Sequence, residues 1–201
     1  GTRFLDGQAG THSFRTGEAV AMLHFSRTAD DGFRQNDFRR RYNAYVKSTL
    51  QLGTDEDIVL TGNLLHQKRG SFLYWKDLGH ALVPPDAQQG DIVRSTRFFI
   101  SSQYRKRLTP ELHLTGKAMW FRNDWNDTID TLTNNSRSDV VRADIQAIWA
   151  PLPENIATFG MEGNIERVDA DLFGNRKGPG GALYAQDDIT LCSPLRLTLG
   201  A

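Results

Sequence analysis

Apolar and polar residues alternate along several long segments of the chain. The segment 38–50 places Phe38, Tyr42, Ala44, Val46 and Leu50 at one parity, and Arg39, Arg41, Asn43, Lys47 and Thr49 at the other. Successive side chains of a strand point to opposite faces, so this pattern predicts a strand with one apolar and one strongly polar face. The same period of two recurs in segments 58–67, 111–120, 141–149 and 157–166. No comparable window shows a helical period, and the pattern therefore predicts an all-β protein.

Turn residues separate these segments, and the connections between them differ in length. Short turns are expected at 53–55, 109–110, 151–155 and 193–194, where Gly, Pro, Asp and Asn gather. Longer polar connections are expected at 29–37, 68–94, 123–139 and 169–181. About nine strands of ~9–14 residues, joined alternately by short turns and long loops, match the layout of an antiparallel up-and-down transmembrane β-barrel. We therefore predict part of such a barrel.

The two strand faces indicate which side of such a barrel would meet lipid. In a barrel wide enough to hold water, the polar face lines the lumen and the apolar face contacts lipid. Aromatic residues fall near the predicted strand ends, as in the girdles of these barrels: Phe72, Tyr74, Trp75, Phe98, Phe99, Trp120, Phe121, Trp125 and Trp149. Ordinary cross-strand packing explains any single one of them equally well, so only their joint placement favours a membrane.

Composition and charge exclude other classes of protein. The 201 residues include 24 basic and 24 acidic ones, and this balance argues against a nucleic-acid partner. No run of about 18 apolar residues predicts a transmembrane helix. The single cysteine, Cys192, excludes an internal disulfide and a CxxC motif. The first residues lack signal-peptide features and the chain stops inside an alternating run, so we expect a fragment of a longer protein.

Residues that would support catalysis or metal binding are scattered. The histidines, His12, His24, His66, His80 and His113, follow no metal-ligand spacing. Neither a GxSxG nucleophile elbow nor a phosphate-binding glycine loop occurs. The acidic residues Glu162, Glu166, Asp169 and Asp171 suit a cation, although a polar strand face rising into a loop explains them as well. The run 39–41 of arginines either steers an anionic ligand or lines a hydrated lumen. We expect no enzyme, no metal and no cofactor.

Several stretches resemble the barrel region of TonB-dependent outer-membrane receptors. The clearest is 181–191, followed by a short turn and the Arg-Leu-Thr-Leu-Gly strand of residues 196–200. It is similar to a strand of that family in which a glycine, an apolar residue and an aromatic residue precede Ala-Gln-Asp. Residues 26–43 resemble the family's first barrel hairpins, and residues 84–97 resemble one of its loops with the strand after it. The resemblance extends over most of the chain.

This resemblance implies a 22-stranded barrel whose lumen is filled by an N-terminal plug domain. Members of the family bind a ferric siderophore, haem or cobalamin outside the Gram-negative outer membrane and import it with energy from the TonB complex. The chain departs from the family pattern because it shows no plug, no TonB box and no final strand ending in an aromatic residue. We therefore expect residues 1–201 to be part of a single receptor barrel domain, and to be unable to transport alone because open sheet edges are not tolerated in lipid.

The expected ligand contribution lies in the long loop 67–91. It combines Arg69, Tyr74, Trp75 and His80, a mixture of aromatic surface and polar groups typical of binding sites. The expected partners are outer-membrane lipid, the TonB complex and a small-molecule nutrient such as a metal chelate. Two alternatives stay open. A passive porin-like channel shares every physical argument above, whereas a soluble β-sandwich binding domain would have shorter strands and need no detergent.

Overall fold

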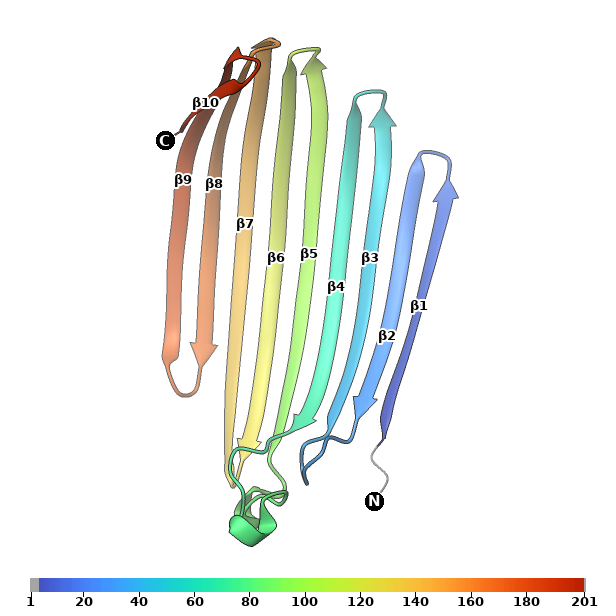
Figure 1. Ribbon diagram of the computed structural model, residues 1–201, viewed down its shortest axis with the longest axis vertical. Helices are drawn as coiled ribbons and strands as arrows, with labels where there is room; N and C mark the ends of the chain where they lie inside the picture. The colour runs from blue at the N-terminus through green and yellow to red at the C-terminus, as the bar shows by residue number, and fades with distance from the viewer. Residues whose placement is uncertain (1–3, 201) are drawn as a thin grey trace.

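The computed structural model describes residues 4–200, which form one sheet of ten strands arranged in chain order (Figure 1). The strands are β1 (Leu5–Thr16), β2 (Ala19–Asp30), β3 (Arg39–Gly53), β4 (Glu56–Gly70), β5 (Ile92–Thr109), β6 (Leu112–Ile129), β7 (Leu132–Leu152), β8 (Asn155–Ala170), β9 (Gly174–Cys192) and β10 (Leu195–Gly200). Each strand pairs antiparallel with its neighbours in sequence, which confirms the predicted all-β up-and-down architecture.

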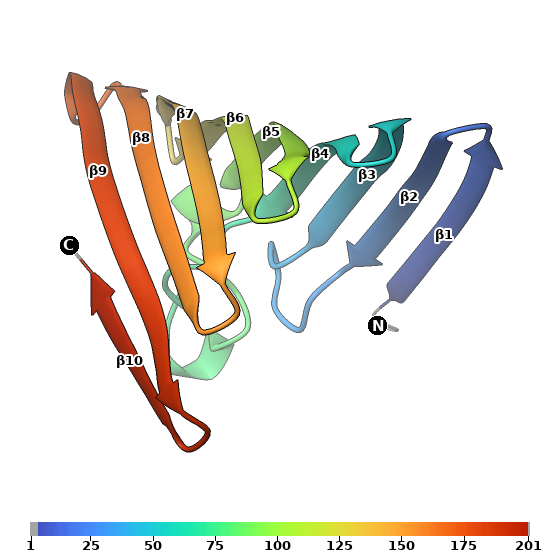
Figure 2. The ribbon, with the colours of Figure 1, turned by 90° about the horizontal axis from the view of Figure 1, so that it is seen from above.

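In the described part of the chain, helical structure is limited to two short 3-10 turns between β4 and β5, η1 (Leu78–His80) and η2 (Asp86–Gln88). Across residues 4–200, no helix has the length and apolar character needed to cross a membrane. Seen from above, the strands follow an arc, with β1 on one side and β9 and β10 on the other (Figure 2). The sheet is therefore an open, curved section of barrel wall.

The strand register gives the sheet two chemically different faces. Residues directly opposite each other in antiparallel strands share a face. One such row contains Leu23, Val46, Gly62, Ile100, Trp120, Val141 and Ile165, and we call its side the apolar face. The adjacent row contains Met22, Lys47, Thr61, Ser101, Met119, Arg142 and Asn164, and we call its side the polar face.

Within residues 4–200, no second layer of structure packs against the apolar face. Val141, Ile145 and Phe159 expose between 50% and 53% of their surface. The buried apolar residues among the described ones are small in number: Ala29, Leu65, Val93, Ala157 and Ala170. The sheet is thus held together largely by its backbone hydrogen bonds, and a wide apolar surface is left exposed.

The apolar face contains a belt of defined height. Alternate residues of β6 are apolar or glycine from Leu112 to Trp120, and on β7 they are apolar from Val141 to Trp149. Eight residue steps span about 26 Å along a strand, or a height of about 20 Å at a strand tilt of about 40°, somewhat less than the ~25 Å apolar band of outer-membrane barrels. We call this band the apolar belt. At its edge, Asp139 Oδ1 accepts hydrogen bonds from Trp120 Nε1 (3.1 Å) and Arg122 Nε (2.8 Å). Charged side chains on the apolar face therefore begin directly at the end of the belt.

The predicted aromatic girdle is divided between the two faces. Trp120 and Trp149 lie on the apolar face at opposite ends of the belt, as a girdle requires. Phe99 and Phe121, in contrast, lie directly opposite each other on the polar face. Their parity along the strand, not their closeness to a strand end, decides which face they occupy.

Two of the four predicted long connections are strands instead. Segment 123–139 continues the β6–β7 ladder until Ile129 lies opposite Leu132, and segment 169–181 continues the β8–β9 ladder until Ala170 lies opposite Gly174. A run of polar residues indicates a loop because a half-buried strand disfavours polar side chains on its buried face. These two segments lie beyond the apolar belt, where both faces of the strand tolerate polar side chains. The strands consequently run from 6 to 21 residues, longer than predicted for most of them. The connections 31–38 and 71–91 are irregular, as predicted.

A glycine on the polar face makes room for an aromatic ring. Tyr184 lies opposite Gly160, and its hydroxyl donates a hydrogen bond to Asp144 Oδ2 at 3.0 Å. A Cβ atom at Gly160 would overlap the Tyr184 ring. We expect Gly160→Ala to lower the free energy of unfolding by about 1–3 kcal/mol, because the ring must move away from Asp144. Denaturant unfolding of the full protein measures this. Gly163→Ala is the control, because a Cβ atom added at Gly163 would lie 4.0 Å from its nearest neighbour, the carbonyl oxygen of Gly180. Equal losses in the two variants would contradict the prediction.

Candidate functional site

The connection between β4 and β5 (residues 71–91), which we call the β4–β5 loop, is the most prominent candidate surface. It projects beyond the strand ends on the side where η1 and η2 lie (Figure 1). Its exposed large apolar side chains are Leu73, Tyr74, Trp75, Leu78 and Leu82, with exposed fractions from 55% to 94%. Several large apolar side chains exposed on one loop make it a candidate binding surface.

Asn36, in the connection between β2 and β3, holds the base of this loop. Its side-chain Nδ2 donates to the carbonyl oxygens of Ser71 (3.1 Å), Gln88 (3.3 Å) and Asp91 (2.8 Å). The Asn36 backbone has a φ of 58°, a left-handed conformation that asparagine adopts more readily than most residues. The amide is thereby aimed at three carbonyl groups that are separated along the chain.

Further contacts join the same two connections. The Gln35 backbone N–H donates to Leu82 O at 2.8 Å, and the Arg34 guanidinium lies 4.3 Å from the centre of the Phe72 ring. A cation at this distance over an aromatic face is attracted by the ring. The β4–β5 loop is therefore docked on the β2–β3 connection along much of its length.

Asp91 ties the loop base to a third connection. It is 2% exposed, and its Oδ1 accepts a hydrogen bond from the backbone N–H of Asp130 at 2.7 Å. Asp130 lies in the turn between β6 and β7 and has a φ of 55°. A buried carboxylate that accepts a backbone hydrogen bond is a strong structural contact, so the tip of the β6–β7 hairpin and the loop base form one unit.

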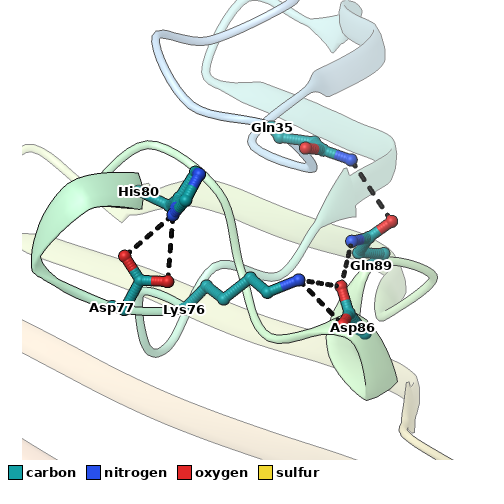
Figure 3. A network of polar contacts seen from close by, with 6 residues as sticks. All are labelled: Gln35, Lys76, Asp77, His80, Asp86 and Gln89. Carbon is teal, nitrogen blue, oxygen red and sulfur yellow. Dashed lines mark hydrogen bonds and ion pairs between the residues drawn. The ribbon is translucent and has the colours of Figure 1, made fainter.

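The outer surface of the loop carries a second set of polar contacts (Figure 3). Lys76 Nζ lies 2.8 Å from both carboxylate oxygens of Asp86, and Gln89 Nε2 donates to Asp86 Oδ1 at 2.9 Å. Gln35 Nε2 reaches Gln89 Oε1 at 3.4 Å and extends this network to the β2–β3 connection. These side chains are exposed, so each contact contributes little to stability alone, but together they define the shape of the loop.

His80 and Asp77 form a separate exposed pair on the loop. His80 Nδ1 lies 2.8 and 2.9 Å from the two Asp77 carboxylate oxygens, and this hydrogen bond lowers the pKa of Asp77 below its ordinary value. Because the folded pKa is lowered, the contribution of the pair to stability is full above the unfolded pKa of the carboxyl group. It is lost as the pH falls through the folded pKa.

The structure places three of the four predicted site residues on this loop. Tyr74 and Trp75 are 65% and 58% exposed, and His80 is held by Asp77 as described. Arg69 lies instead on β4 at the root of the loop, with its guanidinium 5.7 Å from the centre of the Trp125 ring. The sequence predicts an aromatic surface here and did not single out the residues that hold it in place, Asn36 and Asp91.

The other acidic and basic sets are dispersed by the sheet. Glu162 pairs with Arg142 on the polar face, whereas Asp171 accepts a hydrogen bond from the Asn135 backbone N–H at 2.8 Å. Arg40 points to the other face from Arg39 and Arg41 and pairs with Asp31. Within residues 4–200, no group of three or more His, Cys, Asp or Glu side chains is placed to hold a metal ion.

The fold is that of a section of β-barrel wall. The crystal structure of the siderophore receptor PirA from Pseudomonas aeruginosa is similar to it, with a TM-score of 0.75 over 96% of this chain at 17% sequence identity. The chain spans about a third of that receptor, 32% of its length. No protein-family model matches the sequence, and no curated protein matches it. At this identity the likeness establishes the fold.

Proposed function

We propose that residues 1–201 form part of the barrel domain of a Gram-negative outer-membrane receptor that imports a small nutrient, such as a metal chelate, by TonB-coupled active transport. The observation that carries the proposal is the uninterrupted ten-stranded meander with an apolar belt on one face. The plug and the segment that contacts TonB belong to parts of the protein outside these residues. Its role is binding and transport, with no catalytic residue assigned.

The polar face supports a water-filled interior. Arg105 binds Asp57 through two hydrogen bonds of 2.8 Å, Arg142 pairs with Glu162, and Lys117 lies opposite Asp144. Charges at this density are costly next to lipid or in a dry core, whereas a hydrated lumen solvates them. The similarity to a siderophore receptor supports a chelate as the class of cargo.

The β4–β5 loop supplies the proposed ligand contact. Exposed aromatic rings bind planar ligand groups at low entropic cost, and His80 on the loop and Arg69 at its root supply polar groups. We expect Trp75→Ala and Tyr74→Ala each to weaken binding of the transported chelate by about tenfold, a loss of ~1 kcal/mol or more. Titration of the purified full-length receptor measures this. Phe173→Ala, which removes a 78% exposed ring on the β8–β9 turn, is the matched control. Unchanged affinity in both loop variants would refute the assignment.

Uptake by living cells tests the transport itself. A strain that lacks the gene and the same strain carrying it are compared for uptake of radiolabelled ferric siderophores and haem, with and without a protonophore. We expect uptake that requires the gene and stops when the proton gradient is removed. Uptake that continues without the gradient would indicate a passive channel. Recovery of the protein in the aqueous fraction without detergent would indicate a soluble β-sandwich.

A further inference from the structure

A row of basic residues crosses three strands on the apolar face, beyond the apolar belt. Arg40, Lys68 and Arg94 lie directly opposite one another on β3, β4 and β5. Lys68 is four residues from Leu64, and Arg94 is four residues from Phe98, so the cations lie about 13 Å along the strands from these apolar side chains. With strands tilted by about 40°, this separation corresponds to a height of about 10 Å.

Two of these cations lack an acidic partner. Arg40 pairs with Asp31, but Lys68 and Arg94 form no ion pair with any residue in the range 4–200. The Lys68 ammonium lies 5.9 Å from the centre of the Phe38 ring. Like charges directly opposite each other destabilise a sheet, so this arrangement lacks compensation within the chain.

The neighbouring strands show that compensation is available in this fold. Closer to the belt, Arg122, which lies opposite Phe98, pairs with Asp139 at 2.8 Å, and Asp124, which lies opposite Thr96, pairs with Arg137 at 2.6 Å. The facing cations Lys68 and Arg94 are thus a local feature of β4 and β5. Beside them lies a hollow of about 560 Å³, whose lining follows the strands from His66 and Arg94 on β4 and β5 to Asp124, Arg137 and Asp169 on β6, β7 and β8, so that its acidic residues accompany Arg137.

We propose that Lys68 and Arg94, which we call the basic patch, bind the phosphate groups of anionic lipid in the leaflet around the barrel. The inference rests on the proposed function, because the belt must lie in a membrane for the patch to reach its headgroups. The headgroup layer adds about 5–7 Å to each side of the hydrocarbon core, and flexible cations reach along it. Juxtamembrane Lys and Arg residues are attracted to anionic lipid there.

Native mass spectrometry of the full-length protein in detergent tests the proposal, with bisphosphorylated lipid A as the probe. The double variant Lys68→Gln/Arg94→Gln is compared with Lys47→Gln/Arg97→Gln, which removes two cations from the polar face of β3 and β5. We expect the first variant to bind the probe about thirtyfold more weakly and the second to bind it like the wild type. Thermal unfolding in the same detergent shows whether each variant is folded.

Three results would overturn the proposal. They are unchanged binding by the first variant, an equal loss in both variants, and displacement of the lipid by inorganic phosphate at the same concentration, which would indicate a free-anion site. Radiolabelled uptake is measured separately on the same variants. Lost lipid binding with normal uptake supports the basic patch and leaves the transport function intact, whereas uptake that never depends on the gene refutes the function alone.

Discussion

Replacing Ile145 with arginine is expected to destabilise the membrane-inserted protein by about 2–4 kcal/mol. Ile145 lies at the middle of the apolar belt on β7, opposite Gly116 and Met161, and exposes 53% of its surface on the apolar face. If this face contacts lipid, the guanidinium must be placed near the bilayer midplane, where the distance to either interface is greatest. The free energy of unfolding in phosphatidylcholine vesicles, followed by tryptophan fluorescence during a urea titration, measures the effect.

The adjacent residue provides the control for this experiment. Gln146 is one position further along β7, so its side chain points to the polar face, and Gln146→Arg introduces the same group into a hydrated environment. We expect the control to change the free energy of unfolding by less than about 1 kcal/mol. Equal losses at positions 145 and 146 would show that the two faces do not meet lipid and water respectively.

Asn36→Ala is expected to release the β4–β5 loop. The substitution leaves three carbonyl oxygens without their shared donor and places alanine at a φ of 58°. The lost hydrogen bonds and the left-handed backbone together cost about 2–4 kcal/mol. We therefore expect backbone amides of residues 71–91 to exchange their hydrogens about thirtyfold to a thousandfold faster, measured by mass spectrometry on the full-length protein.

Two further variants separate the causes of this effect. Asn36→Gly removes the amide but tolerates the left-handed backbone, so it should show a smaller acceleration than Asn36→Ala. Asn126→Ala removes an exposed side-chain hydrogen bond to Asn135 of 2.7 Å and should leave exchange in the loop unchanged. Slow exchange in Asn36→Ala would mean that the contacts of Gln35 and Arg34 suffice to hold the loop.

The sheet faces were predictable from the sequence because the parity of a strand is a local property. Val46 and Lys47 necessarily point to opposite sides once the segment is extended, whatever the rest of the chain does. The extent of the strands was less predictable. The residues of 123–139 are polar at both parities, and polar residues are equally compatible with a loop and with a strand that stands in water on both faces.

The candidate site was predictable only in its surface chemistry. Tyr74 and Trp75 stand out by composition in a long connection, which is sufficient to expect an exposed aromatic surface. The contacts that hold this loop in place were not predictable in this way, because Asn36 binds the carbonyl groups of residues 35 and 55 positions further along the chain. Such contacts depend on how the connections meet in space. The sequence around an asparagine in a polar segment does not indicate which distant residues it will bind.

If the apolar belt lies in a membrane, the long β6–β7 hairpin determines how far the β4–β5 loop stands from it. From Trp120 at the belt edge to Ile129 at the hairpin end are nine residue steps, or about 30 Å of paired backbone along the strand. Asp91 joins the loop base to Asp130 at the hairpin tip. The hairpin therefore holds the aromatic side chains of the β4–β5 loop at its own far end, away from the apolar belt. In a membrane, this arrangement would place the aromatic side chains beyond the headgroup layer, which adds only about 5–7 Å to each side of the hydrocarbon core, and in contact with water.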